Sequence, residues 1–83
     1  HQNYPNPFNP STTIGFDLPE AAHITIKVFN LVGQQVITLL DGRQEAGTHA
    51  VTFQASNLPS GTYFYRMDVD GIVRQVRQLT LLK

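Results

Sequence analysis

The sequence predicts an all-β domain, an antiparallel sandwich of six to seven short strands. Apolar and polar side chains alternate with a period of two, which is typical of strands that bury one face. Turn-forming residues interrupt these runs at intervals of roughly 8–12 residues, the spacing seen in all-β sandwiches. No stretch of ten residues has a helical period. With 83 residues, the chain is long enough for one small core.

A Pro/Asn-rich segment, residues 1–11, precedes the predicted domain, residues 12–83. Each proline fixes φ, lacks an N–H group and pushes the preceding residue toward extended backbone. We therefore expect a stiff, extended lead-in whose two rings anchor it against the sandwich, and neither a helix nor a central strand. Its motif, NYPNPFNP, consists of Asn3, Tyr4, Pro5, Asn6, Pro7, Phe8, Asn9 and Pro10.

Two alternating runs follow this segment. The run STTIGFDL ends at Pro19, which cannot continue a strand ladder. The run AAHITIKVFN leads into NLVGQQ, a predicted tight turn in which Gly33 supplies a positive φ. The side chains expected on the buried faces of these two strands are Ile14, Phe16, Leu18, Ile24, Ile26 and Val28.

The middle of the chain is less regular. QVITLL is mostly apolar, so we expect a strand buried on both faces, and DGRQEAG after it has the composition of a turn and loop. THAVTF places His49, Val51 and Phe53 on one face of the next strand. QASNLPSG is a second predicted loop.

The last two strands are expected to form a hairpin. TYFYRMDV alternates Tyr63, Tyr65 and Met67 with more polar positions, and the pair Asp70-Gly71 is a strong signal for a two-residue turn. In IVRQVRQLTLL the apolar phase shifts between Val76 and Leu79, which predicts a β-bulge there. If this strand lies at a sheet edge, another chain, including a second copy, can pair with it. These strands and turns together favour an immunoglobulin-like sandwich.

Charge is unevenly distributed. The whole chain has six basic and six acidic residues, yet residues 72–83 hold Arg74, Arg77 and Lys83 and no acid. Three charges are too few for a nucleic-acid partner, because such sites neutralise roughly 6–10 phosphates. The basic last strand is instead a candidate recognition element for a protein partner.

Several function classes are not expected. The chain has no cysteine, which excludes disulfides and thiol metal sites, and no apolar run near the ~18 residues of a membrane helix. It lacks an N-terminal signal pattern, so a secreted form would be a piece of a longer precursor. His23 and His49 lie in strand patterns, and Ser11, Ser56 and Ser60 lie in turn-like contexts without a nucleophile motif. We therefore predict no catalytic residue, no cofactor and no metal.

Two weaker alternatives stay open at this point. DVDG, residues 68–71, resembles the front of a calcium loop, but its twelfth position is Leu79 and not the required glutamate, so a hairpin is favoured. A sugar-binding platform would need exposed rings on one face, whereas buried rings are the default for a small core. The candidate rings are Tyr4, Phe8, Tyr63, Phe64 and Tyr65.

The motif PSGTY has a plain structural explanation. Its residues are Pro59, Ser60, Gly61, Thr62 and Tyr63. The proline and glycine form a turn, and the tyrosine then enters a strand. We expect the phenol to hydrogen-bond back to the loop, as in the tyrosine corner of related sandwiches.

Four segments, in order and over nearly the whole chain, resemble the type A C-terminal sorting domain of the type IX secretion system. They are NYPNPFNPSTTIGFDLP, KVFNLVGQQVITL, LPSGTYFYR and VRQVRQLTLLK. This family is similar to the immunoglobulin-like domain of flagellar hook-capping proteins. Its tail often carries more lysines than the Arg74, Arg77 and Lys83 found here.

The resemblance implies a non-catalytic signal that directs a larger cargo from the periplasm across the outer membrane to the cell surface or beyond. It implies the outer-membrane translocon as partner, and a surface sortase that cleaves at or just upstream of His1. The tail residues expected to be recognised are Arg74, Arg77, Leu79, Leu81, Leu82 and Lys83. The alternative is a module retained on the mature protein for adhesion, assembly or carbohydrate binding.

Overall fold

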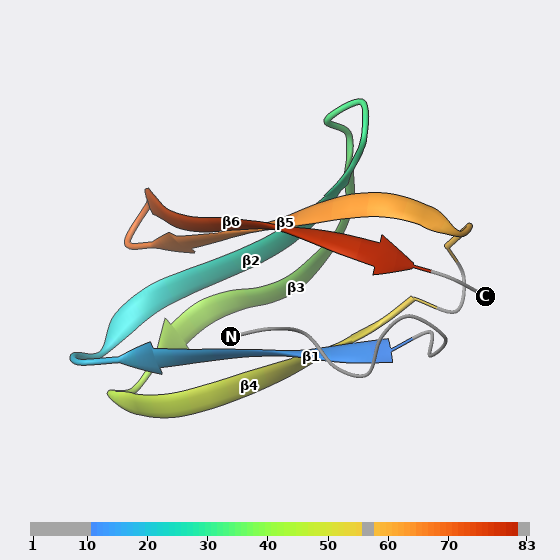
Figure 1. The fold of residues 1–83 in the computed structure, drawn as a ribbon. Coiled ribbons are helices and arrows are strands. Elements are labelled where there is room, and N and C mark those ends of the chain that lie inside the picture. Colours follow the sequence, from blue (N-terminus) through green and yellow to red (C-terminus); the bar gives the residue numbers. More distant parts are fainter. Residues whose placement is uncertain (1–10, 56–57, 82–83) are drawn as a thin grey trace.

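A computed structural model describes residues 11–55 and 58–81, which form six antiparallel strands and no helix. The strands are β1 (Ser11–Leu18), β2 (Ala22–Asn30), β3 (Gln35–Gln44), β4 (Gly47–Gln54), β5 (Gly61–Val69) and β6 (Ile72–Leu81). They make a two-stranded sheet, β1-β4, and a four-stranded sheet, β3-β2-β5-β6. The two sheets face each other as the layers of a sandwich, which confirms the predicted fold class (Figure 1).

The core lies between the two sheets. On β2 the side chains of Ile24, Ile26 and Val28 are 0% exposed, and they meet Ile14 and Phe53 of the opposite sheet within one apolar cluster. The strict alternation of the sequence produces this arrangement, because successive strand residues point to opposite faces. The face assignments predicted for β1, β2 and β5 are confirmed by this burial pattern.

Turn chemistry closes the predicted hairpins. Gly33 has φ +86°, as expected for the turn between β2 and β3. Asp70 and Gly71 have φ values of 50° and 81°, the positive pair that a two-residue hairpin of type I′ requires. The hairpin between β5 and β6 predicted from this dipeptide is therefore confirmed.

Two predictions for β3 are wrong. This strand continues through Gln44, since Asp41, Gly42 and Arg43 pair with β2, so only two residues separate it from β4. It is also not buried on both faces, and Ile37 is 38% exposed. β3 lies at the edge of its sheet, and its register against β2 shifts twice. The opposite sheet has only two strands and does not fully cover this edge strand, which explains the exposure.

The bulge in β6 is displaced from its predicted position. Met67 pairs with Gln75 while Asp68 pairs with Val73, which leaves Arg74 as the extra residue. From Gln75 to Leu81 the register is unbroken, so no bulge separates Val76 from Leu79. The apparent phase shift arises because the two-stranded sheet is too narrow to cover the whole inner face of the four-stranded sheet. The inward positions Gln75 and Arg77 are polar because the opposite sheet does not cover them fully.

We predict that Ile26→Ala will lower the free energy of unfolding by about 2–5 kcal/mol, the usual cost of truncating a fully buried aliphatic side chain. The matched variant Ile72→Ala, at a site that is 56% exposed, should change it by no more than about 0.5 kcal/mol. Urea denaturation of both variants measures the difference. Equal losses would contradict the placement of the core.

Candidate functional site

The PSGTY motif and the described part of the tail meet at one end of the sandwich. β1 begins at Ser11, β5 begins at Gly61 and β6 ends at Leu81, all at the same end of the sandwich (Figure 1). Gly61 is paired directly with Leu81 in the sheet. The motif at residues 3–10 and the tail residues Leu82 and Lys83 lie outside the described residues. The described parts of the predicted turn and tail sites are therefore neighbours in space.

The PSGTY motif forms a tied corner. The Tyr63 hydroxyl donates a hydrogen bond to the Pro59 carbonyl oxygen at 2.7 Å, and the ring is buried in the core. Leu58 N–H donates to the Ala55 carbonyl at 3.0 Å, which steadies the loop before it. Gly61 has φ +155°, a backbone conformation that side chains rarely adopt. The predicted tyrosine corner is confirmed, and it accounts for the proline, glycine and tyrosine of the motif.

The predicted tail site is divided by the structure into two kinds of residue. Leu79 and Leu81 are 4% and 7% exposed and belong to the core. Arg74 and Arg77 are exposed. The bulge at Arg74 lies close to the β5-β6 turn, and Arg77 follows three residues later on the same strand. In the folded domain the leucines anchor β6, and the arginines are the residues that a partner can reach.

Arg77 also affects the chemistry of a buried ring. It is paired across the sheet with Tyr65, which is 3% exposed. Burial raises the pKa of the Tyr65 phenol above its ordinary value of 10.0, and the positive charge of Arg77 offsets part of that rise. The Gln75 side-chain amide is oriented with its oxygen toward Arg77. In this orientation the oxygen accepts hydrogen bonds from Arg77 Nε and Nη2 at 2.5 and 2.9 Å.

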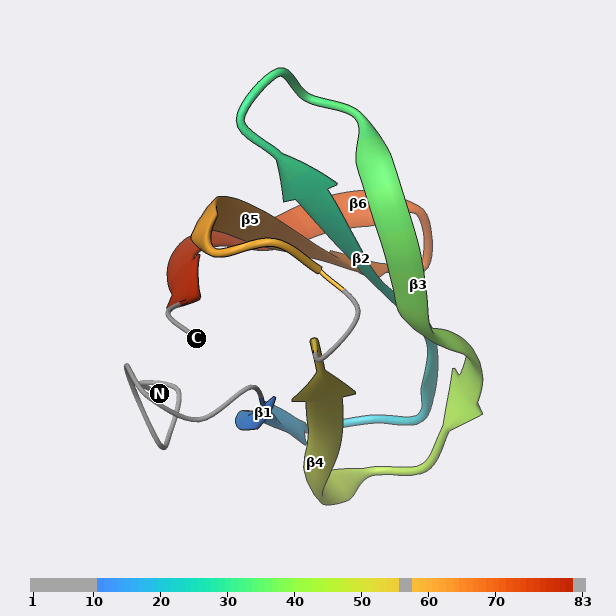
Figure 2. The same ribbon diagram turned by 90° about the vertical axis from the view of Figure 1, so that its right-hand side faces the viewer.

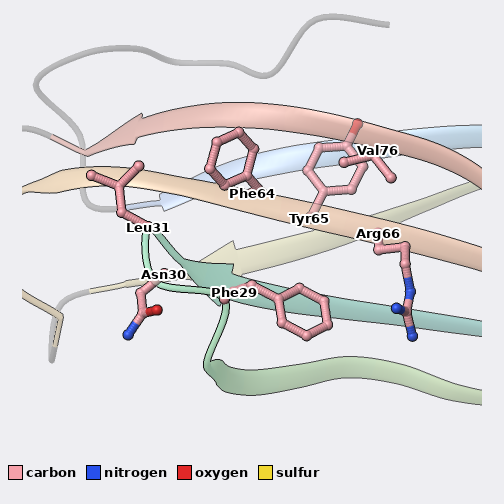
Figure 3. A pocket seen from close by; sticks show the side chains of 8 residues that line it. Phe29, Asn30, Leu31, Phe64, Tyr65, Arg66 and Val76 are labelled. Carbon is pink, nitrogen blue, oxygen red and sulfur yellow. The ribbon is translucent and has the colours of Figure 1, made fainter.

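A shallow groove of about 400 Å³ crosses the outer face of the four-stranded sheet (Figure 3). Phe29 of β2 and Phe64 of β5 are cross-strand partners in it. The Arg66 guanidinium carbon lies 5.3 Å from the centre of the Phe29 ring, and its Nε is 3.0 Å from Asp68 Oδ1. These two contacts fix the Arg66 guanidinium at the groove, over a ring and with one donor on a carboxylate.

This arrangement changes the aromatic residues available for a sugar platform. Tyr63 and Tyr65 are core residues, as the default interpretation of these rings predicts. Phe64 points to the other face, where Phe29 lies beside it, a neighbour that only the pairing of β2 with β5 reveals. Tyr4 and Phe8 lie outside the described residues.

Other candidate residues have structural roles. Asp70 Oδ1 accepts a hydrogen bond from His23 N–H at 2.9 Å, and Asp70 N–H donates to the His23 carbonyl at 2.8 Å, so the β5-β6 turn is tied to the start of β2. The His23 ring contacts Asp41 Oδ1 at 2.7 Å. His49 stacks on Phe16 with ring centres 5.2 Å apart. Both histidines lie in strands, as predicted.

Within residues 11–55 and 58–81, no group of three or more His, Cys, Asp or Glu side chains is arranged to hold a metal ion. The same part of the chain contains no helix long and apolar enough to cross a membrane.

Residues 2–80 match the family described as the secretion system C-terminal sorting domain. The chain belongs to this family. No curated protein and no solved structure matches it. A sorting domain of this family is a C-terminal signal for type IX secretion, so its cargo is destined for the cell surface or the exterior. The domain accordingly interacts with the type IX secretion machinery.

The pH dependence of stability should report on Tyr65. Because its pKa is raised on folding, its contribution to stability is complete below the unfolded value near 10.0 and is lost as pH rises through the higher folded value. Arg77→Gln removes the charge that lowers this pKa, so the variant should lose stability more steeply above pH 10. Urea denaturation together with tyrosinate absorbance measures both effects.

Tyr65→Phe is the matched control for this measurement. It lacks the titrating group, so the alkaline loss of stability should become shallower and one buried tyrosinate step should disappear. A profile identical to that of the parent chain in both variants would contradict the role assigned to Tyr65 and Arg77.

Proposed function

We propose that the type IX translocon recognises this sandwich in its folded form and that the exposed arginines of β6, Arg74 and Arg77, make the decisive contact. The observation that supports this is the combination of a family match over residues 2–80 with an acid-free final strand whose leucines are buried and whose arginines are exposed. A positive, rigidly held strand presents charge in a fixed geometry, which favours a specific partner.

The proposed route has five steps. A precursor with a signal peptide reaches the periplasm, where the domain folds. The outer-membrane translocon binds it and exports the cargo. A surface sortase then cleaves near the Pro/Asn-rich segment, residues 1–11, at the border of the domain formed by residues 12–83. Throughout, the domain acts as a recognition module without enzyme activity, a nucleic-acid partner or insertion into the membrane.

The buried leucines affect how this proposal is tested. Deleting residues 78–83 would remove Leu79 and Leu81 from the core together with the terminal lysine. Loss of export after such a truncation could therefore come from unfolding alone. Substitution of the exposed arginines avoids this difficulty, since surface changes away from the core usually alter stability by no more than about 0.5 kcal/mol.

We predict that a fluorescent reporter with a signal peptide at its start and residues 1–83 at its end will be exported by a bacterium with a type IX system. The reporter should appear outside the cell and be shortened by about the size of the domain. Arg74→Gln combined with Arg77→Gln should reduce the exported fraction about tenfold, the effect of losing roughly 1.4 kcal/mol of binding. Cell fractionation and reporter size provide the measurement.

Arg43→Gln is the matched control for these variants, because Arg43 is equally an exposed arginine but lies on β3, at the opposite edge of the sheet. Its reporter should be exported normally. Normal export of the double variant, with the folded state verified by circular dichroism, would contradict recognition through β6. Export at full length would contradict removal by a sortase.

The groove between Phe29 and Phe64 favours a second candidate, a retained module for adhesion, assembly or carbohydrate binding. Two outer-face rings beside Arg66 form an apolar surface on which a sugar ring can stack. The similarity of the family to hook-capping domains, expected from the sequence, favours the same alternative. Mature extracellular protein that still contains residues 1–83 and is retained on insoluble polysaccharide would favour this function over the sorting function.

A further inference from the structure

β6 presents a long and regular sheet edge. In the four-stranded sheet it pairs with β5 on one side and is the last strand in the order β3-β2-β5-β6 of the described residues. Backbone N–H and C=O groups in an antiparallel strand point alternately to the two sides, so every second residue of β6 directs its groups outward. From Gln75 to Leu81 the register is unbroken and no proline interrupts it.

The opposite edge of the same sheet is much less suited to pairing. The register of β3 against β2 shifts between Ile26 and Lys27 and again between Val28 and Phe29. Bulges of this kind twist a strand and interrupt its outward hydrogen-bonding row. β3 thus has the features by which proteins protect an edge, whereas β6 has only one bulge, at Arg74 near the turn.

The side chains along the regular part of β6 define what an added strand must contain. Val76 is 58% exposed on the outer face beside Arg66, and Arg77 is exposed on the inward face beside Tyr65. Side chains of an added strand would lie directly next to these two, one on each face. An apolar residue fits beside Val76 and an acidic residue beside Arg77, so neighbouring residues of the added strand should alternate between these types.

Charge also decides between the possible occupants. A second copy of β6 paired antiparallel over residues 75–81 would place its Arg77 diagonally across from that of the first, and no acid lies in residues 72–83 to compensate. Like charges placed across a strand pair are destabilising. An acidic strand from a different protein has the complementary charge and gains backbone hydrogen bonds along the whole edge.

We infer that the edge of β6 between Gln75 and Leu81 accepts an extended segment of a partner protein, with alternating apolar and acidic residues, as an additional strand of the sheet. This inference rests on the proposed recognition through β6 and specifies its mechanism. Main-chain hydrogen bonds provide the affinity, while Arg77 and Val76 select the side chains.

The test uses the 83-residue chain and labelled synthetic peptides. The probe is Thr-Val-Glu-Val-Glu-Val-Thr, and its charge-reversed control has lysine in place of glutamate. The glutamate peptide should bind, measured by fluorescence anisotropy, and the lysine peptide should bind about tenfold more weakly or not at all. Arg77→Glu should reverse this preference, whereas Arg43→Glu on β3 should leave it unchanged.

Two glutamate peptides with N-methyl groups, at odd or at even positions, separate strand addition from simple charge attraction. One of them loses the N–H groups that face β6, so it should bind at least about tenfold more weakly, although its charge is the same. When the parent peptide is bound, the backbone amide protons of alternate residues between Gln75 and Leu81 should exchange more slowly with solvent, as measured by NMR. Equal binding of all the peptides, no binding, or protection confined to the Phe29 groove would overturn the inference.

The remaining outcomes are also decisive. Protection of β6 that grows with protein concentration without peptide would mean that a second copy is the occupant, and the inference would be wrong. Reporter export is scored separately from peptide binding. If Arg77→Glu blocks export but no peptide binds, the sorting function stands and strand addition fails. If peptides bind but export does not need the domain, the sorting function fails and the edge site stands.

Discussion

The structure depends on the burial of one central strand, β2. Its residues Ile24, Ile26 and Val28 are fully enclosed, and it pairs with β3 on one side and β5 on the other. A slip of one residue would bring His23, Thr25 and Lys27 into the core in their place, so the register is strongly determined. β5 is fixed against β2, and β6 is fixed in turn against β5 by the turn at Asp70-Gly71. The position of the basic strand therefore follows from the core.

The different sizes of the two sheets explain which side chains of the larger sheet are exposed. Two strands oppose four, so the strands at the edges of the larger sheet are only partly covered (Figure 2). Along β6 the inward side chains are covered at one end of the strand and only partly covered at the other. Leu79 and Leu81 reach the core near the PSGTY corner, while Gln75 and Arg77 on the same face remain polar. One strand is thus both anchored and available to a partner, a combination that suits a recognition signal on a small domain.

Much of the fold could be predicted from local patterns. Alternation assigned the faces of β1, β2 and β5, and specific turn residues, Gly33 and Asp70-Gly71, located two hairpins. The predicted tyrosine corner is present because Tyr63 has both an inward strand position and a carbonyl within reach. These features depend on residues close in sequence, where the stereochemistry of the chain leaves few alternatives.

The errors arise where distant strands decide the outcome. Residues 41–44 have the composition of a turn, yet pairing with β2 holds them in β3. The inward side of β6 is polar at Gln75 and Arg77 because the two-stranded sheet does not fully cover it, and no local sequence signal indicates how far that cover extends. Phe29 and Arg66 are far apart in sequence and meet only through the pairing of β2 with β5. The burial of Leu79 and Leu81 likewise follows from the register of β6 against β5 and not from a local signal.

Among residues 11–55 and 58–81, β6 is paired with β5 on one side and with no strand on the other, and residue-resolved amide hydrogen exchange on the 83-residue chain tests this arrangement most directly. Amides in β2 and β5 should exchange slowest, since strands paired on both sides are the most protected. In β6, between Gln75 and Leu81, slow and fast amides should alternate along the strand. Uniformly slow exchange throughout this stretch would mean that the edge is already covered in the free domain, and it would contradict this arrangement.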